Sequence, residues 1–253
     1  MMNVSPKTDL EFSMRNFRTI CIIPARGGSK GLPGKNKKLL IDKPLVAWPI
    51  TSALECPFID EVICSTDDPE IQAIAIQYGA TAPFFRPESL SSDTAQTADV
   101  ILHAINYAEE MLGKHYDYVV LLEPTSPLTT SKDVSNAFGQ LLANRPKATS
   151  IVGVSKVEST HPEYDVRLDN HGFISPYLVD DFSLLRRRQE IEELYFLEGS
   201  VYISEVEAFK THKSFYHSKT LGYEVPRWKS IEIDELIDFL MVETIMNNVG
   251  DLK

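Results

Sequence analysis

Apolar runs and amphipathic segments alternate along the first 154 residues of the chain. Short, near-continuous apolar runs predict buried strands, and apolar residues at helical spacing predict helices that pack on them. The pattern predicts strands over residues 19–25, 61–67 and 116–124, and helices over residues 45–55, 68–79 and 94–113. The helix over 68–79 has the clearest ends, because Asp68 is a suitable N-cap, Pro69 fits the first position and Gly79 is a stop signal. An α/β fold follows, with a mainly parallel sheet and helices on both faces.

The pattern changes over residues 155–193, which mix turn residues, short alternating runs and a basic triplet. This segment predicts an arm rather than another strand-helix-strand unit. Strand character resumes over residues 199–204, and residues 234–248 predict a closing amphipathic helix capped at Asp234 or next to it. Residues 1–18 are polar and unpatterned, so we expect a flexible extension followed by one main domain over residues 19–253.

Composition limits the partners. The formal net charge of −11 argues against nucleic acid and anionic membranes, which are held by an excess of Lys and Arg. Cys21, Cys56 and Cys64 have no metal-like spacing and predict buried, reduced thiols. No apolar run is long enough to span a bilayer and the N-terminus has no hydrophobic signal core, so a cytoplasmic protein is expected.

One local cluster of positive charge stands out against this acidic background. Residues 22–40 read IIPARGGSKGLPGKNKKLL and follow the first predicted strand. Glycines leave the backbone free to curl around an anion while the Arg and Lys side chains supply charge. The segment is not a P-loop, because five residues separate Gly28 from Gly34 and Asn36 stands where a magnesium-binding hydroxyl is needed. The cluster predicts a site for a small, highly anionic ligand.

Further candidate residues follow other predicted strands. Ligands of parallel sheets collect at the carboxyl ends of the strands. Four features leave strands there: the glycine-rich loop after Pro24, STDD after Cys64, EPTSPLTT after Leu122 and the segment that leads to IEID.

Several motifs resemble one family when taken together. The motifs are PARGGSKGLPGKN, RPESLSSDTAQTADV, EPTSPL, RRRQ and IEIDELIDF, and they occur in the order seen in acylneuraminate cytidylyltransferases, the CMP-sialic acid synthetases. The resemblance runs from about residue 20 to the end. It implies a Rossmann-like nucleotide-sugar transferase fold and a magnesium-dependent reaction of CTP with a nine-carbon 2-keto acid sugar, which gives a CMP-sugar and pyrophosphate.

The resemblance assigns roles to residues of the cationic loop and beyond. It implies that Arg26, Lys30 and Lys35 handle the phosphates, where fixed cations stabilise the charge that develops on the departing pyrophosphate. The residues implied to hold the nucleotide are Ser29, Asn36, Arg86, Glu123, Thr125 and Ser126. Alternatives remain open for some of these residues: Arg86 could instead pair with Glu88 or Asp93, and Lys37 and Lys38 could be merely solvated.

The resemblance also implies a sugar contact and an assembly. Arg188, directly before Gln189, is the candidate that grips the carboxylate of the acidic sugar, because a guanidinium binds a carboxylate through two parallel hydrogen bonds. Its alternative is pairing with nearby acids such as Glu190. The arm over residues 155–193 cannot bury its own apolar runs, so it is expected to form a homodimer as the family's dimerisation arm does. Whether Arg188 serves the neighbouring subunit stays open.

A metal site is predicted in SIEIDE. If this segment is a strand, Glu232 and Asp234 project from one face while Ile231 and Ile233 enter the core. Paired carboxylates suit Mg²⁺, which also takes substrate phosphates. Family members often have Asp at 232, Gln at 123 and Asn at 198, so Glu232, Glu123 and Glu198 each depart from the pattern.

Two other functions stay open from the sequence alone. One is the cytidylyltransferase for the eight-carbon acid 3-deoxy-octulosonate, which shares the fold and the chemistry. The other is a nucleotide-binding homologue that has lost catalysis. Pyrophosphate release from CTP with different keto-acid sugars separates the three.

Overall fold

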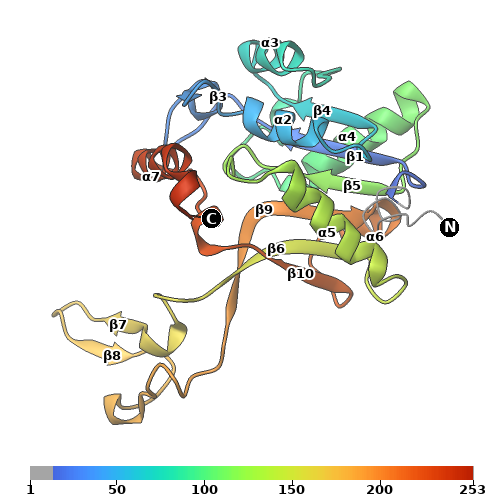
Figure 1. Cartoon of the computed structure of the whole chain (residues 1–253). Coiled ribbons are helices and arrows are strands. Elements are labelled where there is room, and N and C mark those ends of the chain that lie inside the picture. The colour runs from blue at the N-terminus through green and yellow to red at the C-terminus, as the bar shows by residue number, and fades with distance from the viewer. Residues whose placement is uncertain (1–13, 253) are drawn as a thin grey trace.

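The computed structural model describes residues 14–252 and contains a six-stranded sheet with the strand order β10-β6-β9-β5-β1-β4 (Figure 1). β1 pairs in parallel with β4 and β5, and β10 pairs in parallel with β6. β9 runs antiparallel to its neighbours β5 and β6. The strands are β1 (Thr19–Pro24), β4 (Glu61–Ser65), β5 (Tyr118–Leu121), β6 (Ser150–Lys156), β9 (Tyr195–Glu205) and β10 (Thr220–Glu224). The predicted α/β fold with a mainly parallel sheet is confirmed.

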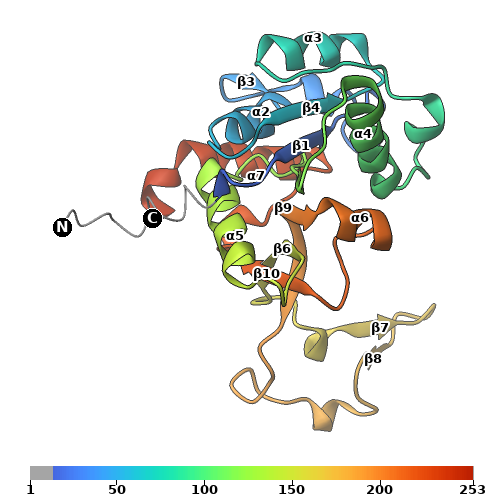
Figure 2. The same ribbon diagram turned by 90° about the vertical axis from the view of Figure 1, so that its right-hand side faces the viewer.

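Helices cover both faces of the sheet (Figures 1 and 2). The α-helices are α2 (Ala47–Leu54), α3 (Pro69–Gln77), α4 (Thr97–Leu112), α5 (Ser131–Ala143), α6 (Val206–His212) and α7 (Leu236–Asn247). The 3₁₀ helices are η1 (Lys35–Lys37), η2 (Glu88–Leu90), η3 (Pro162–Tyr164), η4 (Phe182–Leu184), η5 (Arg227–Lys229) and η6 (Val249–Leu252). Two short strands, β2 (Leu39–Leu40) and β3 (Lys43–Pro44), pair beside the main sheet.

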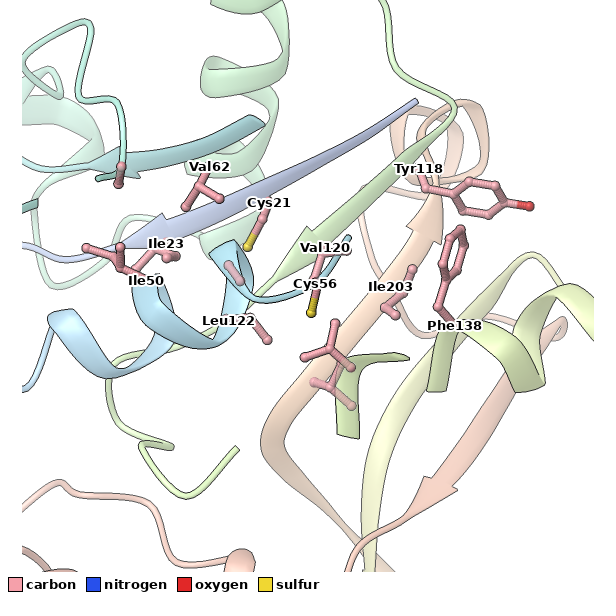
Figure 3. Packing of buried hydrophobic residues seen from close by; sticks show 14 of the residues in the cluster. Cys21, Ile23, Ile50, Cys56, Val62, Tyr118, Val120, Leu122, Phe138 and Ile203 are labelled. Carbon is pink, nitrogen blue, oxygen red and sulfur yellow. The ribbon is translucent and has the colours of Figure 1, made fainter. Parts of the chain in front are cut away.

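Alternation along β1 explains how one strand serves two cores. Cys21 and Ile23 pack in the cluster that includes residues of α2, α3 and α5, part of which is drawn in Figure 3. Ile20 and Ile22 pack in a second cluster with residues of α4 and α6. Because successive side chains of a strand point to opposite faces, an unbroken apolar run is what a sheet covered on both sides requires.

The elements predicted for the first half of the chain are all present. The best-defined prediction was α3: its N-cap, Asp68, accepts hydrogen bonds from the backbone N–H groups of Glu70 and Ile71 at 2.8 and 3.1 Å. Pro69 is the first helical residue, and Gly79 follows the helix with a φ of +96°. The sequence pattern did not predict α6 or β10, and it placed the start of β9 four residues too late.

Most of the predicted N-terminal extension lies outside the described residues. Its described part, residues 14–18, contacts the domain: Met14 is buried, and the ring of Phe17 meets that of Tyr118 edge-on with 5.3 Å between centroids.

The segment between β6 and β9 projects away from the sheet as an arm (Figures 1 and 2). It carries the hairpin of β7 (Val166–Leu168) and β8 (Ile174–Pro176). Many large apolar side chains of the arm are exposed, among them Tyr164, Leu168, Phe173, Ile174, Tyr177, Leu178 and Leu184. This agrees with the prediction that the arm does not bury its apolar residues within one chain.

The three cysteines are free and buried, as predicted. Burial raises the pKa of the Cys56 and Cys64 thiols to about 12, so these side chains remain protonated at neutral pH. Within residues 14–252, no helix has the length and apolar character needed to cross a bilayer.

Candidate active site

The cationic loop follows the carboxyl end of β1 and is held in shape by its own residues. Gly34 precedes η1 with a φ of +68°, a left-handed conformation that glycine adopts without strain. Gly31 lies so close to the backbone of Asp234 that a Cβ atom there would be 2.4 Å from its carbonyl oxygen. The buried side chain of Asn36 donates from Nδ2 to the carbonyl oxygen of Arg26 at 2.9 Å. Asn36 therefore fixes the backbone at the start of the loop as well as lining the site.

A cavity of about 380 Å³ opens beside this loop. It gathers most of the side chains that the sequence predicted for phosphate and nucleotide binding: Arg26, Ser29, Lys30, Lys35, Asn36, Glu123, Thr125 and Asp234. They come from the loop after β1, the turn after β5 and the segment before α7, which are far apart in the sequence. The prediction that ligands collect at the carboxyl ends of the strands thus agrees with the position of this cavity.

Lys35 connects the loop to the segment before α7. Its side chain is 12% exposed, and Nζ donates to the carbonyl oxygen of Ile233 at 2.6 Å and lies 3.1 Å from Oδ1 of Asp234. Lys37, by contrast, pairs with Asp68 at 3.0 Å and Glu70 at 3.1 Å. Lys37 is therefore ion-paired rather than merely solvated, and it does not line the cavity.

A second cavity of about 260 Å³ shares Pro24, Arg26 and Glu123 with the first. Arg86 lines it and is only 6% exposed. Among the described residues, its Nε and Nη2 atoms have no hydrogen-bond partner. Burial lowers the pKa of this guanidinium, and the alternative pairing with Glu88 or Asp93 does not occur. Buried donors without partners are costly, so Arg86 is suited to a polar group of a ligand.

A third cavity of about 280 Å³ extends the cleft past Glu123, which lines all three. Its wall includes the aromatic residues Tyr202, Phe215 and Tyr216. No sequence pattern indicated these residues. Tyr202 lies in a run correctly taken for a strand, but only the position of β9 between β5 and β6 brings that run to the cleft.

Glu123 stands where three cavities and several charges meet. Burial, with added repulsion from Glu232 and Asp234, raises the pKa of its carboxyl to about 7, although Lys35 acts in the opposite direction. A carboxyl that keeps its proton near neutral pH can donate a hydrogen bond as well as accept one. Glu123 can therefore present the same pair of functions as the amide of a glutamine.

The predicted metal residues lie close together, but not on a strand. Residues 230–233 have no regular secondary structure, and the segment is attached to the turn after β5 by a 2.8 Å hydrogen bond from Ile233 N to the carbonyl oxygen of Thr125. The strand prediction was wrong, although Ile233 is fully buried and Ile231 partly buried as expected. Asp234 does not cap α7: the N-cap is Glu235, which forms a capping box with Asp238.

The charge of Asp234 acts on the neighbouring carboxyl of Glu232. Burial, then repulsion from Asp234, raises the pKa of Glu232, whose side chain also accepts a hydrogen bond from the backbone of Gly199. Asp234 lines the phosphate cavity and its side chain is 75% exposed. Among residues 14–252, no group of three or more His, Cys, Asp and Glu side chains is arranged to hold a metal ion.

Ser126 and Glu198 are buried and do not line the three cavities. Ser126, which the resemblance implies to hold the nucleotide, is only 3% exposed, and its hydroxyl lies against Gly199, where a Cβ atom would be 2.8 Å away. Glu198 is 2% exposed and accepts hydrogen bonds from the backbone N–H of Ser200, at 3.0 Å, and from its hydroxyl. Burial, with repulsion from Glu232 and Asp133, raises the pKa of Glu198 to about 7.

The raised pKa of Glu198 predicts a pH-dependent cost to stability. The folded protein keeps this proton at pH values where the unfolded chain has lost it, so stability falls as the pH rises from about 4.5 to 7 and the loss persists above 7. Glu198→Gln is therefore expected to raise the free energy of unfolding at pH 8 by on the order of 2 kcal/mol, with little change near pH 4.5. Denaturant unfolding at both pH values measures this, with the exposed Glu88→Gln as a control. An equal change at both pH values would show that the raised pKa of Glu198 is not the cause.

Two of the three consecutive arginines, Arg186 and Arg188, have different partners within the arm. Arg186 forms a two-pronged ion pair with Glu163, with Nε and Nη2 at 3.0 and 2.8 Å from its carboxylate oxygens, which lowers the pKa of Glu163 to about 2. Arg188 donates to the carbonyl oxygen of Glu158 at 2.7 Å and lines a cavity of about 630 Å³ within the arm. Within one chain, Arg188 does not line the phosphate cavity. Its role toward a sugar stays a prediction.

The sequence profile that describes cytidylyltransferases matches residues 20–246, which is most of the chain. The chain belongs to the cytidylyltransferase family. It is therefore a nucleotidyltransferase, and the family resemblance drawn from the motifs is confirmed.

Individual proteins match over nearly the whole length of this chain. The chain is 34% identical to a CMP-N,N'-diacetyllegionaminic acid synthase of Legionella pneumophila, over 91% of this chain and 97% of the relative. It is also 34% identical to an N-acylneuraminate cytidylyltransferase of Escherichia coli, over 93% of this chain but only 54% of that protein. A solved CMP:2-keto-3-deoxy-manno-octonic acid synthetase complexed with CTP has the same fold, with a TM-score of 0.66 at 18% identity over 91% of this chain and 99% of that one.

Proposed function

We propose that this cytidylyltransferase activates a nonulosonic acid, a sialic-acid-like nine-carbon keto sugar, with CTP. One observation carries the proposal: Arg26, Lys30 and Lys35 share a single cavity with Glu123, Thr125 and Asp234 in a chain of this family. The named activities of the relatives that match along the chain support the nine-carbon class of sugar.

In this proposal the three cavities that Glu123 lines divide the substrates between them. The cations of the loop receive the triphosphate, and the unpartnered donors of Arg86 receive polar groups of the nucleoside. The aromatic wall of Tyr202, Phe215 and Tyr216 receives the sugar. Glu123, which borders all three cavities, lies where the two substrates meet.

In this arrangement the anomeric hydroxyl oxygen of the sugar forms a bond to the α-phosphorus of CTP and loses its proton to solvent. The bond from that phosphorus to the bridging oxygen breaks, and pyrophosphate leaves with its charge on oxygens that face Arg26, Lys30 and Lys35. Fixed cations lower the barrier most where charge grows, so these side chains act on the leaving group. No covalent enzyme intermediate is needed.

Magnesium fits the carboxylates beside the loop. Glu123 and Glu232 have raised pKa values caused partly by neighbouring carboxylates, and a cation in their midst relieves this repulsion. Glu232 and Asp234 would hold Mg²⁺, and phosphate oxygens would complete its shell. When bound, the ion supplies positive charge to the phosphates that react.

Pyrophosphate release tests the proposal. The purified chain is incubated with CTP, Mg²⁺ and one of three acids: N-acetylneuraminic acid, N,N'-diacetyllegionaminic acid or 3-deoxy-octulosonate. We expect release with at least one nine-carbon acid and much less with the eight-carbon acid. Preference for the eight-carbon acid would reassign the substrate, and binding of CTP without release from any acid would identify a non-catalytic homologue.

We also propose a homodimer built through the arm. The exposed apolar side chains of the arm, such as Phe173, Ile174 and Leu178, need a partner surface, and a second copy supplies one. Light scattering at micromolar concentration is expected to give twice the chain mass. Phe173→Ser combined with Leu178→Ser is expected to shift the protein toward the monomer, and a wild-type monomer would contradict the proposal.

A further inference from the structure

The carboxylate of Asp93 lies between two cations of the phosphate loop. Oδ1 is 2.8 Å from Nη1 of Arg26, and Oδ2 is 2.6 Å from Nζ of Lys30. Asp93 belongs to the segment between η2 and α4, so it reaches the loop from another part of the chain. Its two oxygens each take one cation, which is the arrangement that two oxygens of a phosphate group would adopt.

Two other cations of the loop, Lys35 and Lys37, have acidic partners elsewhere. Lys35 is bound to Ile233 and Asp234, and Lys37 is bound to Asp68 and Glu70. Among the described residues, Asp93 is the only acidic residue that forms an ion pair with Arg26 or Lys30. The ion pairs hold the pKa of Asp93 below its usual value, so the carboxylate is charged at neutral pH.

These ion pairs are easily exchanged for stronger ones. The Lys30 side chain is 80% exposed and that of Asp93 is 45% exposed, and ion pairs in such positions contribute little stability in water. A pyrophosphate or triphosphate group carries several negative charges, whereas Asp93 carries one. The phosphates can therefore displace the carboxylate of Asp93, but they must compete with this carboxylate for Arg26 and Lys30.

We propose that Asp93 is an internal competitor of the phosphates: it holds Arg26 and Lys30 in the free enzyme, yields them to the triphosphate and takes them back as pyrophosphate leaves. The inference rests on the proposed function for the identity of the physiological ligand. Asp93 also lines the cavity of Arg86, so its release changes the wall of the nucleoside site at the moment the phosphates bind.

Two effects follow from this arrangement. The carboxylate keeps Arg26 and Lys30 close together against their mutual repulsion, so they are in place when the triphosphate arrives. It also weakens the hold on pyrophosphate, which promotes product release. Without Asp93, anions should bind more tightly and the product should inhibit more strongly.

Calorimetric titration with inorganic pyrophosphate and with CTP, in EDTA so that no metal contributes, tests the proposal. Asp93→Asn is expected to bind pyrophosphate about 3- to 10-fold more tightly than wild type, since two weak ion pairs no longer compete. In the forward reaction with Mg²⁺, the inhibition constant of pyrophosphate should fall by a similar factor. Asp99→Asn is the matched control, because it removes one charge from the first turn of α4 without touching the pairs with Arg26 and Lys30.

The outcomes separate clearly. Unchanged or weaker pyrophosphate binding by Asp93→Asn, with Asp93→Ala giving the same result, would overturn the proposal and make Asp93 a positioning residue only. An equal gain in Asp99→Asn would also overturn it, because the effect would then be general charge. If wild type bound pyrophosphate but did not bind CTP even when Mg²⁺ was supplied, the proposed function would fail, and the titration with pyrophosphate would still decide the role of Asp93.

Discussion

Lys35→Ala is expected to lower kcat by about 10²- to 10³-fold, the loss seen when one transition-state donor is removed. The Lys35 side chain is 12% exposed, compared with 29% for Lys37 and 33% for Arg26, so its charge acts in a partly desolvated site. The loss should be at least as large in kcat as in the affinity for CTP, because the charge on the leaving pyrophosphate grows only during the reaction. Steady-state kinetics together with direct CTP titration separate the two.

Lys37→Ala is the matched control. It removes the same charge from the same loop, but Lys37 is paired with Asp68 and Glu70 rather than directed at the cavity. We expect its kcat to stay within about threefold of wild type, because Lys37 does not line the phosphate cavity. A Lys35→Ala enzyme that retained activity within about threefold of wild type would refute the role of Lys35.

Asp234→Asn is expected to abolish magnesium-dependent turnover while CTP still binds. The substitution keeps the size of the side chain but removes the charge that a hard divalent cation requires. Glu232→Gln should be severely impaired for the same reason, whereas Glu232→Asp, which keeps the charge, should retain activity or improve it. Titration of turnover with Mg²⁺ and equilibrium binding of CTP measure the two parts of this prediction.

Glu235→Gln serves as the control for Asp234→Asn. Glu235 is the next residue and also lines the cavity, but its carboxylate caps α7, so its loss should reduce helix stability more than magnesium use. Near-normal turnover and an unchanged magnesium requirement in Asp234→Asn would show that the metal assignment is wrong.

Local patterns were sufficient for most of the fold and for much of the site. The apolar run of β1 and the capping residues of α3 carry their structure in adjacent residues, so the sequence predicted both. The cations of the loop could be found because they cluster within thirteen consecutive positions, 26–38, of an acidic chain. Such signals do not depend on how distant segments meet.

The remaining features depend on tertiary contacts. Nothing near Asp93 in the sequence indicates that it meets Arg26 and Lys30, which lie more than sixty positions earlier. Tyr202 reaches the cleft only because β9 inserts between β5 and β6. The alternation of Ile231 and Ile233 suggested a strand, but the segment forms a single backbone hydrogen bond to the turn after β5. The two side chains alternate because both are buried in the core, not because they belong to a sheet.

Strand β9 has a consequence for building chimaeras between relatives. Its first residues, Tyr195 to Leu197, pair with the end of β6 at the base of the arm, and the same strand continues through Gly199, beside Glu232, to Tyr202 in the cleft. The register of this pairing shifts between Val152 and Val154 of β6, and the extra residues lie on β9 between Leu197 and Tyr202. An arm exchanged at its visible base would cut through the strand that shapes the cleft. Exchange of β6 and β9 as whole strands, with crossover points in the connections before Ser150 and after Glu205, would instead transfer the arm with its own side of the cleft.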